Sequence, residues 1–240
     1  MTTSTTTQLP KCWQDAQDVL NAGVDRLILF GPPGVGKTFA GLNYGNVSAG
    51  AWRVNCTDDM TTADVTGHWL PAGDSEWIWR DGGATQALRG GGRLVLDEVD
   101  KASGDVLATL LAVTDTPESI HLEHPGLNGN IKPTHGYSVV CTTNCEDMRD
   151  LPEALVDRFP VRIRINEPHP DALATLSYDL RDYARRASDL GERRISLRQF
   201  QSFDKLRKGL GDQVRAANIV FGDKLAQAVL DAIAIDKVLK

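Results

Sequence analysis

The sequence has no hydrophobic run long enough to cross a membrane, so we expect no membrane partner. It also lacks a long basic run, and its formal net charge of −6 does not favour a nucleic-acid partner. Its four cysteines are scattered and form no C-x-x-C pair, as is typical of reduced thiols. Residues 1–8 lack the basic and apolar regions of a secretory signal, so we expect a cytoplasmic protein.

A chain of 240 residues with 41% hydrophobic and 24% charged residues is long enough for one large domain and a small satellite. The Thr-rich residues 1–8 predict a disordered tail. Strand-like runs alternate with helical ones through residues 9–167, and no strand pattern follows. We therefore predict an α/β domain over 9–167 and a small helical domain over 168–240.

One glycine-rich stretch has every fixed residue of the phosphate-binding pattern G-x-x-x-x-G-K-[ST]. An apolar run at 26–30 predicts a buried parallel strand before it, and 39–44 predicts a helix after it. This order brings backbone N–H groups and a helix N-terminus to one anion site. We expect Lys37 at the β- and γ-phosphates and Thr38 on Mg²⁺. The predicted nucleotide contacts are Gly31, Pro32, Pro33, Gly34, Val35, Gly36, Lys37, Thr38 and Phe39.

A second apolar run, at 93–96, ends in two adjacent carboxylates. The first, Asp97, can hold Mg²⁺ beside the phosphate loop. The second, Glu98, is placed to polarise the attacking water. Two carboxylates are needed because one balances the cation while the other accepts a proton. A third apolar run, at 137–143, ends at Asn144, whose amide can reach the γ-phosphate or the attacking water.

Two further stretches predict β-hairpins, at 67–83 and 117–133. The first holds three of the five tryptophans, which indicate either a small local core or an exposed contact surface. The second contains residues 118–123 as one strand and a partner near 130–132. Three histidines, His121, His124 and His135, match no metal-binding module, so a polar surface hairpin accounts for them.

The remaining segments complete the prediction. Helices are expected at 10–22, 59–65, 84–89, 102–113 and 151–159, and strands at 51–55 and 161–165. In the C-terminal part, helices are expected at 171–187, 196–208 and 212–239. The fold class is therefore α/β, with a parallel sheet, flanking helices, hairpin insertions and an all-α lid.

Over nearly its whole length the chain resembles the AAA+ ATPases, and within them the MoxR-like and McrB-like branch. The motifs that carry the resemblance are the phosphate loop, residues 94–100, 142–144, 151–159 and 193–198. The resemblance implies that Asn144 is sensor 1 and that Arg158 is an arginine finger reaching a neighbour's nucleotide. It also implies that a lid arginine, matched to Arg198, is sensor 2.

Two positions depart from the family pattern. Cys145 stands where relatives often have proline, and Leu197 replaces the proline of a Ser-Pro-Arg segment. The second departure leaves Arg193 and Arg194 as competitors of Arg198 for the sensor 2 role.

The resemblance implies ATP and Mg²⁺ as cofactors and a homo-oligomeric ring, usually a hexamer. The first hypothesis is a motor that hydrolyses ATP at subunit interfaces and remodels a partner protein, such as one of the von Willebrand factor A type. A motor acting on nucleic acid, as in a restriction or phage replication system, is a second hypothesis, which needs a basic pore or ring face. A scaffold that binds nucleotide without hydrolysis is a third, and the presence of both Asp97 and Glu98 speaks against it.

Overall fold

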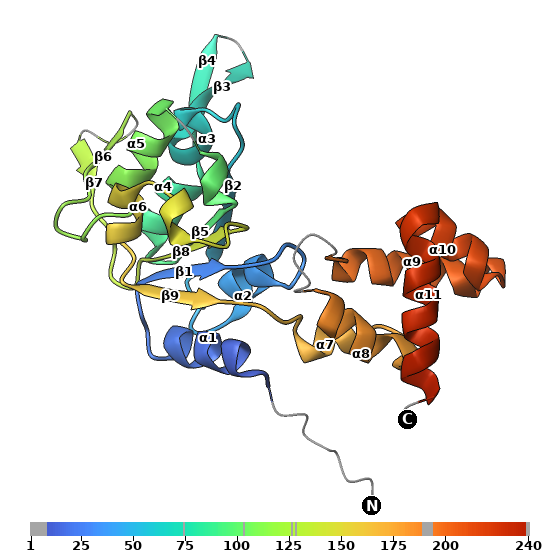
Figure 1. Cartoon of the computed structure of the whole chain (residues 1–240). Helices are drawn as coiled ribbons and strands as arrows, with labels where there is room; N and C mark the ends of the chain where they lie inside the picture. Colours follow the sequence, from blue (N-terminus) through green and yellow to red (C-terminus); the bar gives the residue numbers. More distant parts are fainter. Residues whose placement is uncertain are drawn as a thin grey trace, which may run out of the picture. The chain divides into compact units, whose positions relative to one another are not determined.

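The computed structural model describes residues 9–73, 75–102, 104–125, 127, 129–188 and 194–238. The tail predicted at 1–8 and Arg193 lie outside the described residues. The chain forms two compact units (Figure 1). The sheet unit comprises Asp15–Gly31 and Lys37–Arg164, and the helical unit comprises the described residues of Met1–Gln14, Pro32–Gly36 and Ile165–Lys240. The domain boundary after residue 167 stays a prediction.

The described strands of the sheet unit include a five-stranded sheet in which every neighbouring pair is parallel, which confirms the predicted α/β fold class. Its order is β2-β5-β8-β1-β9. The strands are β1 (Arg26–Phe30), β2 (Ala51–Asn55), β5 (Arg93–Asp97), β8 (Ser138–Thr143) and β9 (Val161–Arg164). Because β5, β8 and β1 are neighbours, the residues that follow them meet at one edge of the sheet.

Burial on both faces explains why the three central strands, β5, β8 and β1, have mostly apolar sequences. All five residues of β5 are buried, and Leu27, Ile28 and Leu29 of β1 are fully buried. Helix α2 (Lys37–Asn43) approaches the sheet closely at Gly41, where a Cβ atom would lie 3.2 Å from Val95. The other helices of this unit are α3 (Thr62–Thr66), α4 (Gly83–Gly90), α5 (Gly104–Val113) and α6 (Glu153–Asp157), and α1 (Lys11–Asn21) has residues in both units.

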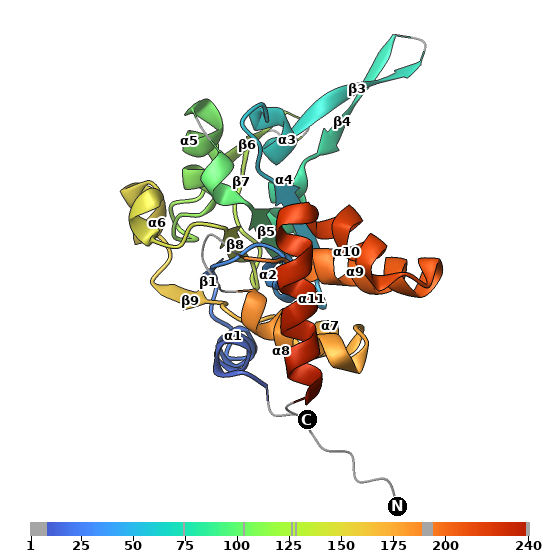
Figure 2. The same ribbon diagram turned by 45° about the vertical axis from the view of Figure 1, so that its right-hand side comes forward.

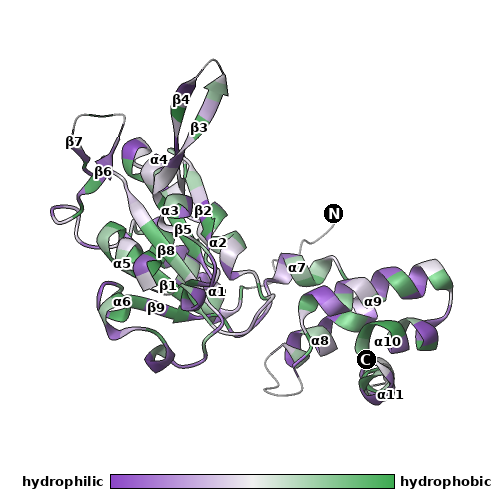
Figure 3. Cartoon of the chain, turned by 90° about the horizontal axis from the view of Figure 1, so that it is seen from above, coloured by the Kyte–Doolittle hydropathy of each residue, from purple (hydrophilic) through white to green (hydrophobic). Residues whose placement is uncertain are grey.

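The first hairpin, β3 (Gly67–Gly73) and β4 (Glu76–Asp81), projects from the rest of the sheet unit (Figure 2). Trp69 and Trp77 are 46% and 61% exposed. Trp79 is half-buried and packs edge-on against Trp69 and His124. The tryptophans therefore form both a small local cluster and an exposed surface, and Figure 3 shows hydrophobic residues, in green, on both strands.

The second hairpin is shorter than predicted. It consists of β6 (Leu122–His124) and β7 (Gly129–Ile131). Residues 118–121 do not pair with a strand, because the carbonyl of Thr116 accepts from the N–H groups of Ser119 and Ile120 and closes a turn. That turn buries the Ile120 side chain completely.

The described helical unit contains α7 (Pro170–Ala174), α8 (Tyr178–Ala187), α9 (Leu197–Leu210), α10 (Gln213–Phe221) and α11 (Asp223–Val238). The single helices predicted at 171–187 and 212–239 are wrong, since each is two helices. The first breaks where Ser177 begins α8, and the second at Gly222, whose φ of 74° favours glycine. No described helix combines the length and apolar character that a bilayer span requires.

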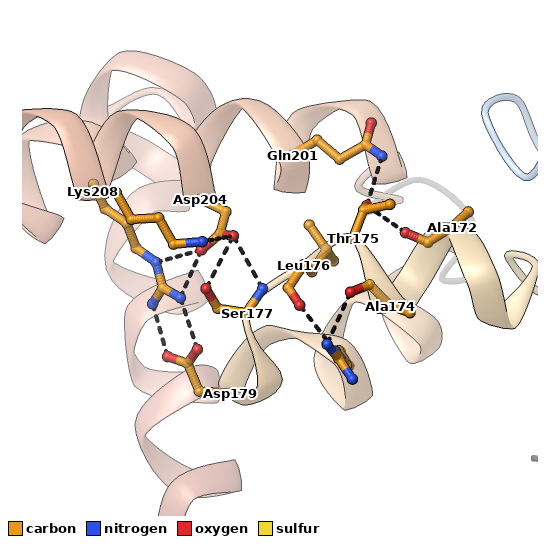
Figure 4. Close-up of polar contacts among 11 residues, drawn as sticks. Ala172, Ala174, Thr175, Leu176, Ser177, Asp179, Gln201, Asp204 and Lys208 are labelled. Carbon is orange, nitrogen blue, oxygen red and sulfur yellow. Dashed lines mark hydrogen bonds and ion pairs between the residues drawn. The ribbon is translucent and has the colours of Figure 1, made fainter. Parts of the chain in front are cut away.

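A buried carboxylate joins two helices of this unit (Figure 4). Oδ2 of Asp204 accepts from the Ser177 N–H and hydroxyl at 3.0 and 3.1 Å and from Lys208 at 2.7 Å. Arg207 donates to Asp204 Oδ1 at 3.0 Å and grips Asp179 with two hydrogen bonds. The start of α8 is thereby fixed to the middle of α9.

Candidate functional site

The loop between β1 and α2 contains three glycines with positive φ, namely Gly31 (124°), Gly34 (79°) and Gly36 (115°). Positive φ angles of this kind let backbone N–H groups turn toward one point, as an anion-binding concavity requires. A Cβ atom at Gly36 would lie 3.4 Å from the buried ring of Trp13, so a side chain there meets both strain and crowding.

Lys37 begins α2 and is 6% exposed. Its Nζ donates to the Gly31 carbonyl at 2.8 Å and to Asn144 Oδ1 at 3.0 Å. A buried ammonium needs such acceptors, because an unpaired buried charge is costly. Both bonds hold the positive charge at the carboxyl edge of the sheet.

Asn144 connects Lys37 to Glu98. Its Nδ2 donates to Glu98 Oε1 at 3.2 Å, while its Oδ1 accepts from Lys37. Asn144 directly follows β8 and Glu98 directly follows β5, its neighbour in the sheet. The parallel sheet thus places an ammonium, an amide and a carboxylate in one hydrogen-bonded series.

Asp97 lies beside this series and is 4% exposed. Its Oδ1 accepts from the hydroxyls of Thr38, at 2.6 Å, and Thr142. Its Oδ2 pairs with the guanidinium of Arg53. Burial raises the pKa of Asp97, but the two hydroxyls and Arg53 together hold that pKa below its ordinary value. Asp97 is therefore a charged carboxylate beside the Thr38 hydroxyl.

Glu98 has a left-handed backbone with φ of 55°, which costs a non-glycine residue about 1 kcal/mol. Its N–H donates to the Thr142 hydroxyl at 3.2 Å, and the short helix Val99–Lys101 begins directly after it. The chain therefore turns sharply between two adjacent carboxylates whose side chains have different partners.

Arg158 directly follows α6, and the contacts of its side chain are with other residues than those of this cluster. Its Nη1 donates to the Ala154 carbonyl at 2.6 Å and its Nη2 to Asp115 Oδ2 at 2.8 Å. Its Nε has no hydrogen-bond partner among the residues that the structure describes. The Thr116 N–H and the Arg158 guanidinium hold the pKa of Asp115 below its ordinary value. None of these contacts with described residues reaches Lys37 or Asp97.

The other predicted contacts have varied environments. Phe39 is 60% exposed and meets Tyr44 edge-on, whereas Val35 is buried. Arg198 is exposed in the first turn of α9, and Arg194 is half-buried before it. Arg198 belongs to the helical unit, and its assignment as sensor 2 stays a prediction.

The histidines have no shared site. His124 is buried, and its Nε2 lies 2.8 Å from Asp81 Oδ1, while His121 and His135 are exposed. Within the described residues, no three His, Cys, Asp or Glu side chains gather as a metal-binding group.

Sequence reasoning missed two partners. Arg53 pairs with Asp97, and Asp115 pairs with Arg158. A signal for Arg53 was present, because alternation along β2 places Arg53 and Asn55 on one face beside the acidic strand. Asp115 has no such signal, since it lies 43 positions from Arg158 in a connecting segment.

These residues fit a phosphorylated ligand with a hard cation. The loop glycines and the buried ammonium of Lys37 suit phosphate oxygens. The Thr38 hydroxyl and the charged carboxylate of Asp97 are oxygen donors of the kind that Mg²⁺ prefers.

Comparison with known families gives one match over most of the sheet unit. Residues 26–159 match the family model described as AAA domain (dynein-related subfamily). This match covers more than half of the chain. It includes Lys37, Asp97, Glu98, Asn144 and Arg158 and confirms the resemblance stated from the motifs.

Two curated relatives are similar over shorter stretches. Protein NorQ of Paracoccus denitrificans is 34% identical over 119 residues, which are 49% of this chain and 43% of that protein. Denitrification regulatory protein NirQ of Pseudomonas aeruginosa is 36% identical over 101 residues, which are 42% of this chain and 38% of that protein. The chain thus matches less than half the length of each relative.

Among solved structures, NtrX of Brucella abortus in complex with ATP has a TM-score of 0.56 at 17% identity, covering 83% of this chain and 51% of that chain. NtrX in complex with ADP has a TM-score of 0.55 at 16% identity, covering 82% and 49%. At this identity the likeness shows a shared fold.

Proposed function

The chain belongs to the dynein-related subfamily of AAA domains, and we propose that it is an ATPase that forms a ring and hydrolyses ATP where its subunits meet. The observation that carries this proposal is the series from Lys37 through Asn144 to Glu98, beside the Thr38–Asp97 pair. Lys37 and the loop N–H groups bind the phosphates.

The two carboxylates take different roles. Thr38 and Asp97 hold Mg²⁺, which neutralises charge on the phosphates when it is bound. Glu98 orients the attacking water and accepts its proton, and Asn144 holds the Glu98 carboxylate in place through a 3.2 Å hydrogen bond. This division suits the environments, because Asp97 is buried among donors and Glu98 is half-buried.

Arg158 supplies its charge to the nucleotide of a neighbouring subunit. Its contacts in its own chain go to Ala154 and Asp115. Its side chain is 25% exposed, so a guanidinium nitrogen can reach a partner surface from the position directly after α6. An arginine supplied in trans couples hydrolysis to assembly.

The work performed is the remodelling or activation of a partner protein, for which a von Willebrand factor A-type protein is the first candidate. One relative, NirQ of Pseudomonas aeruginosa, is named a denitrification regulatory protein. The surface that meets the partner is the projecting β3–β4 hairpin, because Trp77 and Ile78 are 61% and 55% exposed there.

The test is the ATPase rate per subunit against protein concentration, with mass measured alongside. We expect the rate to rise steeply as a ring, most simply a hexamer, forms. Arg158→Ala and Lys37→Ala should each be inactive, with about a thousandfold loss for the arginine. A mixture of the two should regain part of the activity, since each subunit supplies what the other lacks.

Two results of these experiments would contradict the proposal. A rate per subunit that is independent of concentration, from a monomer, contradicts hydrolysis in trans. Unchanged nucleotide binding by Lys37→Ala contradicts the assignment of the phosphate loop.

A further inference from the structure

A cation from the edge of the sheet contacts the proposed metal-binding carboxylate. Arg53 lies on β2, the edge strand next to β5, and its side chain is 49% exposed. Its Nη2 pairs with Oδ2 of Asp97 and lies 3.2 Å from Asn55 Oδ1. The strand register sets Asn55 opposite Asp97, so Arg53 reaches two positions along the ladder to make this contact.

Asp97 has both of its oxygens in use. The hydroxyls of Thr38 and Thr142 donate to Oδ1, and the guanidinium occupies Oδ2. Within the described chain, Arg53 is the one cation paired with Asp97. Its pairing differs from an ordinary surface ion pair, because the carboxylate side chain is only 5% exposed and is therefore weakly screened by solvent.

We propose that Arg53 is a positioning residue that competes with the divalent cation for Asp97, and so makes metal retention depend on the nucleotide phosphates. The inference rests on the proposed nucleotide site. A guanidinium and a dication beside the same carboxylate repel each other, and phosphate charges offset that repulsion. Asp97 therefore binds the metal weakly when the site is empty and more tightly when nucleotide phosphates are present.

The surroundings of Arg53 allow this exchange. Its half-exposed side chain can move without opening the core, since the neighbouring Val54 carries the buried contact of β2. The same Nη2 keeps a second acceptor in Asn55 when the carboxylate takes a cation. Loss of one partner then leaves neither group buried and unpaired.

The experiment measures the affinity of the full chain for a fluorescent ADP in EDTA and at a series of free Mg²⁺ concentrations. Arg53→Met keeps the apolar stem and removes the charge. We expect its ADP affinity in EDTA to match the wild type, and the gain in ADP affinity at saturating Mg²⁺ to shrink about five- to tenfold, because loss of the charge strengthens metal binding to the empty site more than to the nucleotide-bound site. Arg53→Lys keeps a charge, so its gain should stay close to the wild-type value.

Two controls isolate the effect. Arg149→Met removes an exposed arginine that also pairs with an aspartate, Asp147, and it should leave the Mg²⁺ gain unchanged. In an Asp97→Asn background, Arg53→Met should have no effect, because the competition acts through that carboxylate.

Each failure has its own meaning. Fluorescent ADP that binds no variant contradicts the proposed nucleotide site. Normal ADP binding with an equal or larger gain at saturating Mg²⁺ in a folded Arg53→Met protein overturns the role of Arg53 and leaves the nucleotide site intact.

Discussion

Two buried aspartates of this chain have similar surroundings and different consequences. Asp97 and Asp204 are each 4% exposed, and hydrogen bonds hold the pKa of each below its ordinary value against the effect of burial. Burial and pKa therefore do not distinguish a candidate site from a structural network here.

The origin of the partners does distinguish them. Asp204 is met by Arg207 and Lys208 of its own helix and by Ser177 at the start of α8. These partners belong to one packed unit, and two of them are cations. Asp97 is met by two hydroxyls and a single, half-exposed cation that come from three other segments at the open edge of a parallel sheet. Asp97 can exchange its half-exposed cation partner for a bound ligand, which is what a binding site requires. Asp204 is held by two cations and by the start of α8, which is what a junction between two helices requires.

The largest expected contrast is in turnover. Asp97→Asn removes the charge that faces the proposed metal and should lower the ATPase rate about a thousandfold, or ~4 kcal/mol of transition-state stabilisation. Asp204→Asn should leave the rate per folded subunit within about twofold. Steady-state ATPase assays of both variants at equal ring concentration provide the measurement. Equal losses of ATPase rate in the two variants would contradict the assignment of Asp97 to the site and of Asp204 to a structural network.

The contrast should reverse for stability. Asp204→Ala deprives Ser177 of two hydrogen bonds and leaves Lys208 without its carboxylate, while Arg207 keeps Asp179. We expect a loss of about 3 kcal/mol in the free energy of unfolding, measured by urea titration of the helical signal. Asp97→Asn should cost less, since Arg53 can turn to solvent and to Asn55. A smaller loss for Asp204→Ala than for Asp97→Asn would reverse the assignment.

Much of the arrangement at Asp97 could be predicted because the motif fixes it locally. The loop glycines, Lys37 and Thr38 follow one another, and Asp97, Glu98 and Asn144 end apolar runs whose parallel strands meet at one edge. Their proximity follows from topology alone. Arg53 and Asp115 could not be assigned, because their contacts depend on which long side chain crosses a strand or a connecting segment.

The helical unit was predicted less well for a related reason. Its sequence is helical nearly throughout, so periodicity does not mark the breaks. The break before α8 depends on Ser177 donating to Asp204, which is 27 positions away. The hairpin at 122–131 is short because Thr116 closes a local turn. In both places a hydrogen bond to one side chain or carbonyl ends the helix or strand that the sequence pattern predicts to continue.

The lowered pKa of Asp204 should make the free energy of unfolding depend on pH in acid. A folded-state pKa below the unfolded value contributes stability above the unfolded pKa, and that stability is lost as pH falls through the folded value. For Asp204, whose pKa is lowered, the loss begins below about pH 4. In Asp204→Asn the slope of unfolding free energy against pH should fall there by up to one proton, about 1.4 kcal/mol per pH unit.

Asp147→Asn is the matched control. The side-chain hydrogen bond from exposed Arg149 lowers the pKa of Asp147 to about 2, yet the pair faces solvent. Its effect on the acid slope should disappear in high salt, whereas that of Asp204 should persist. Equal salt sensitivity of the two variants would contradict a buried network at Asp204.

The smallest expected effect separates the two hydroxyl partners. Ser177→Ala removes one hydrogen bond to Asp204 and keeps the backbone N–H bond, so it should cost about 1 kcal/mol of stability and leave Mg²⁺-dependent nucleotide affinity unchanged. Thr142→Val keeps nearly the same volume and removes the hydroxyl that donates to Asp97 Oδ1. It should change the Mg²⁺-dependent nucleotide affinity, because Oδ1 then has one hydrogen-bond donor fewer when the cation is bound. Urea unfolding and fluorescent-ADP titration of both variants make the test. If Ser177→Ala changed the Mg²⁺ response as much as Thr142→Val, the helix junction and the nucleotide site would be coupled, and the separation between the two aspartates would not hold.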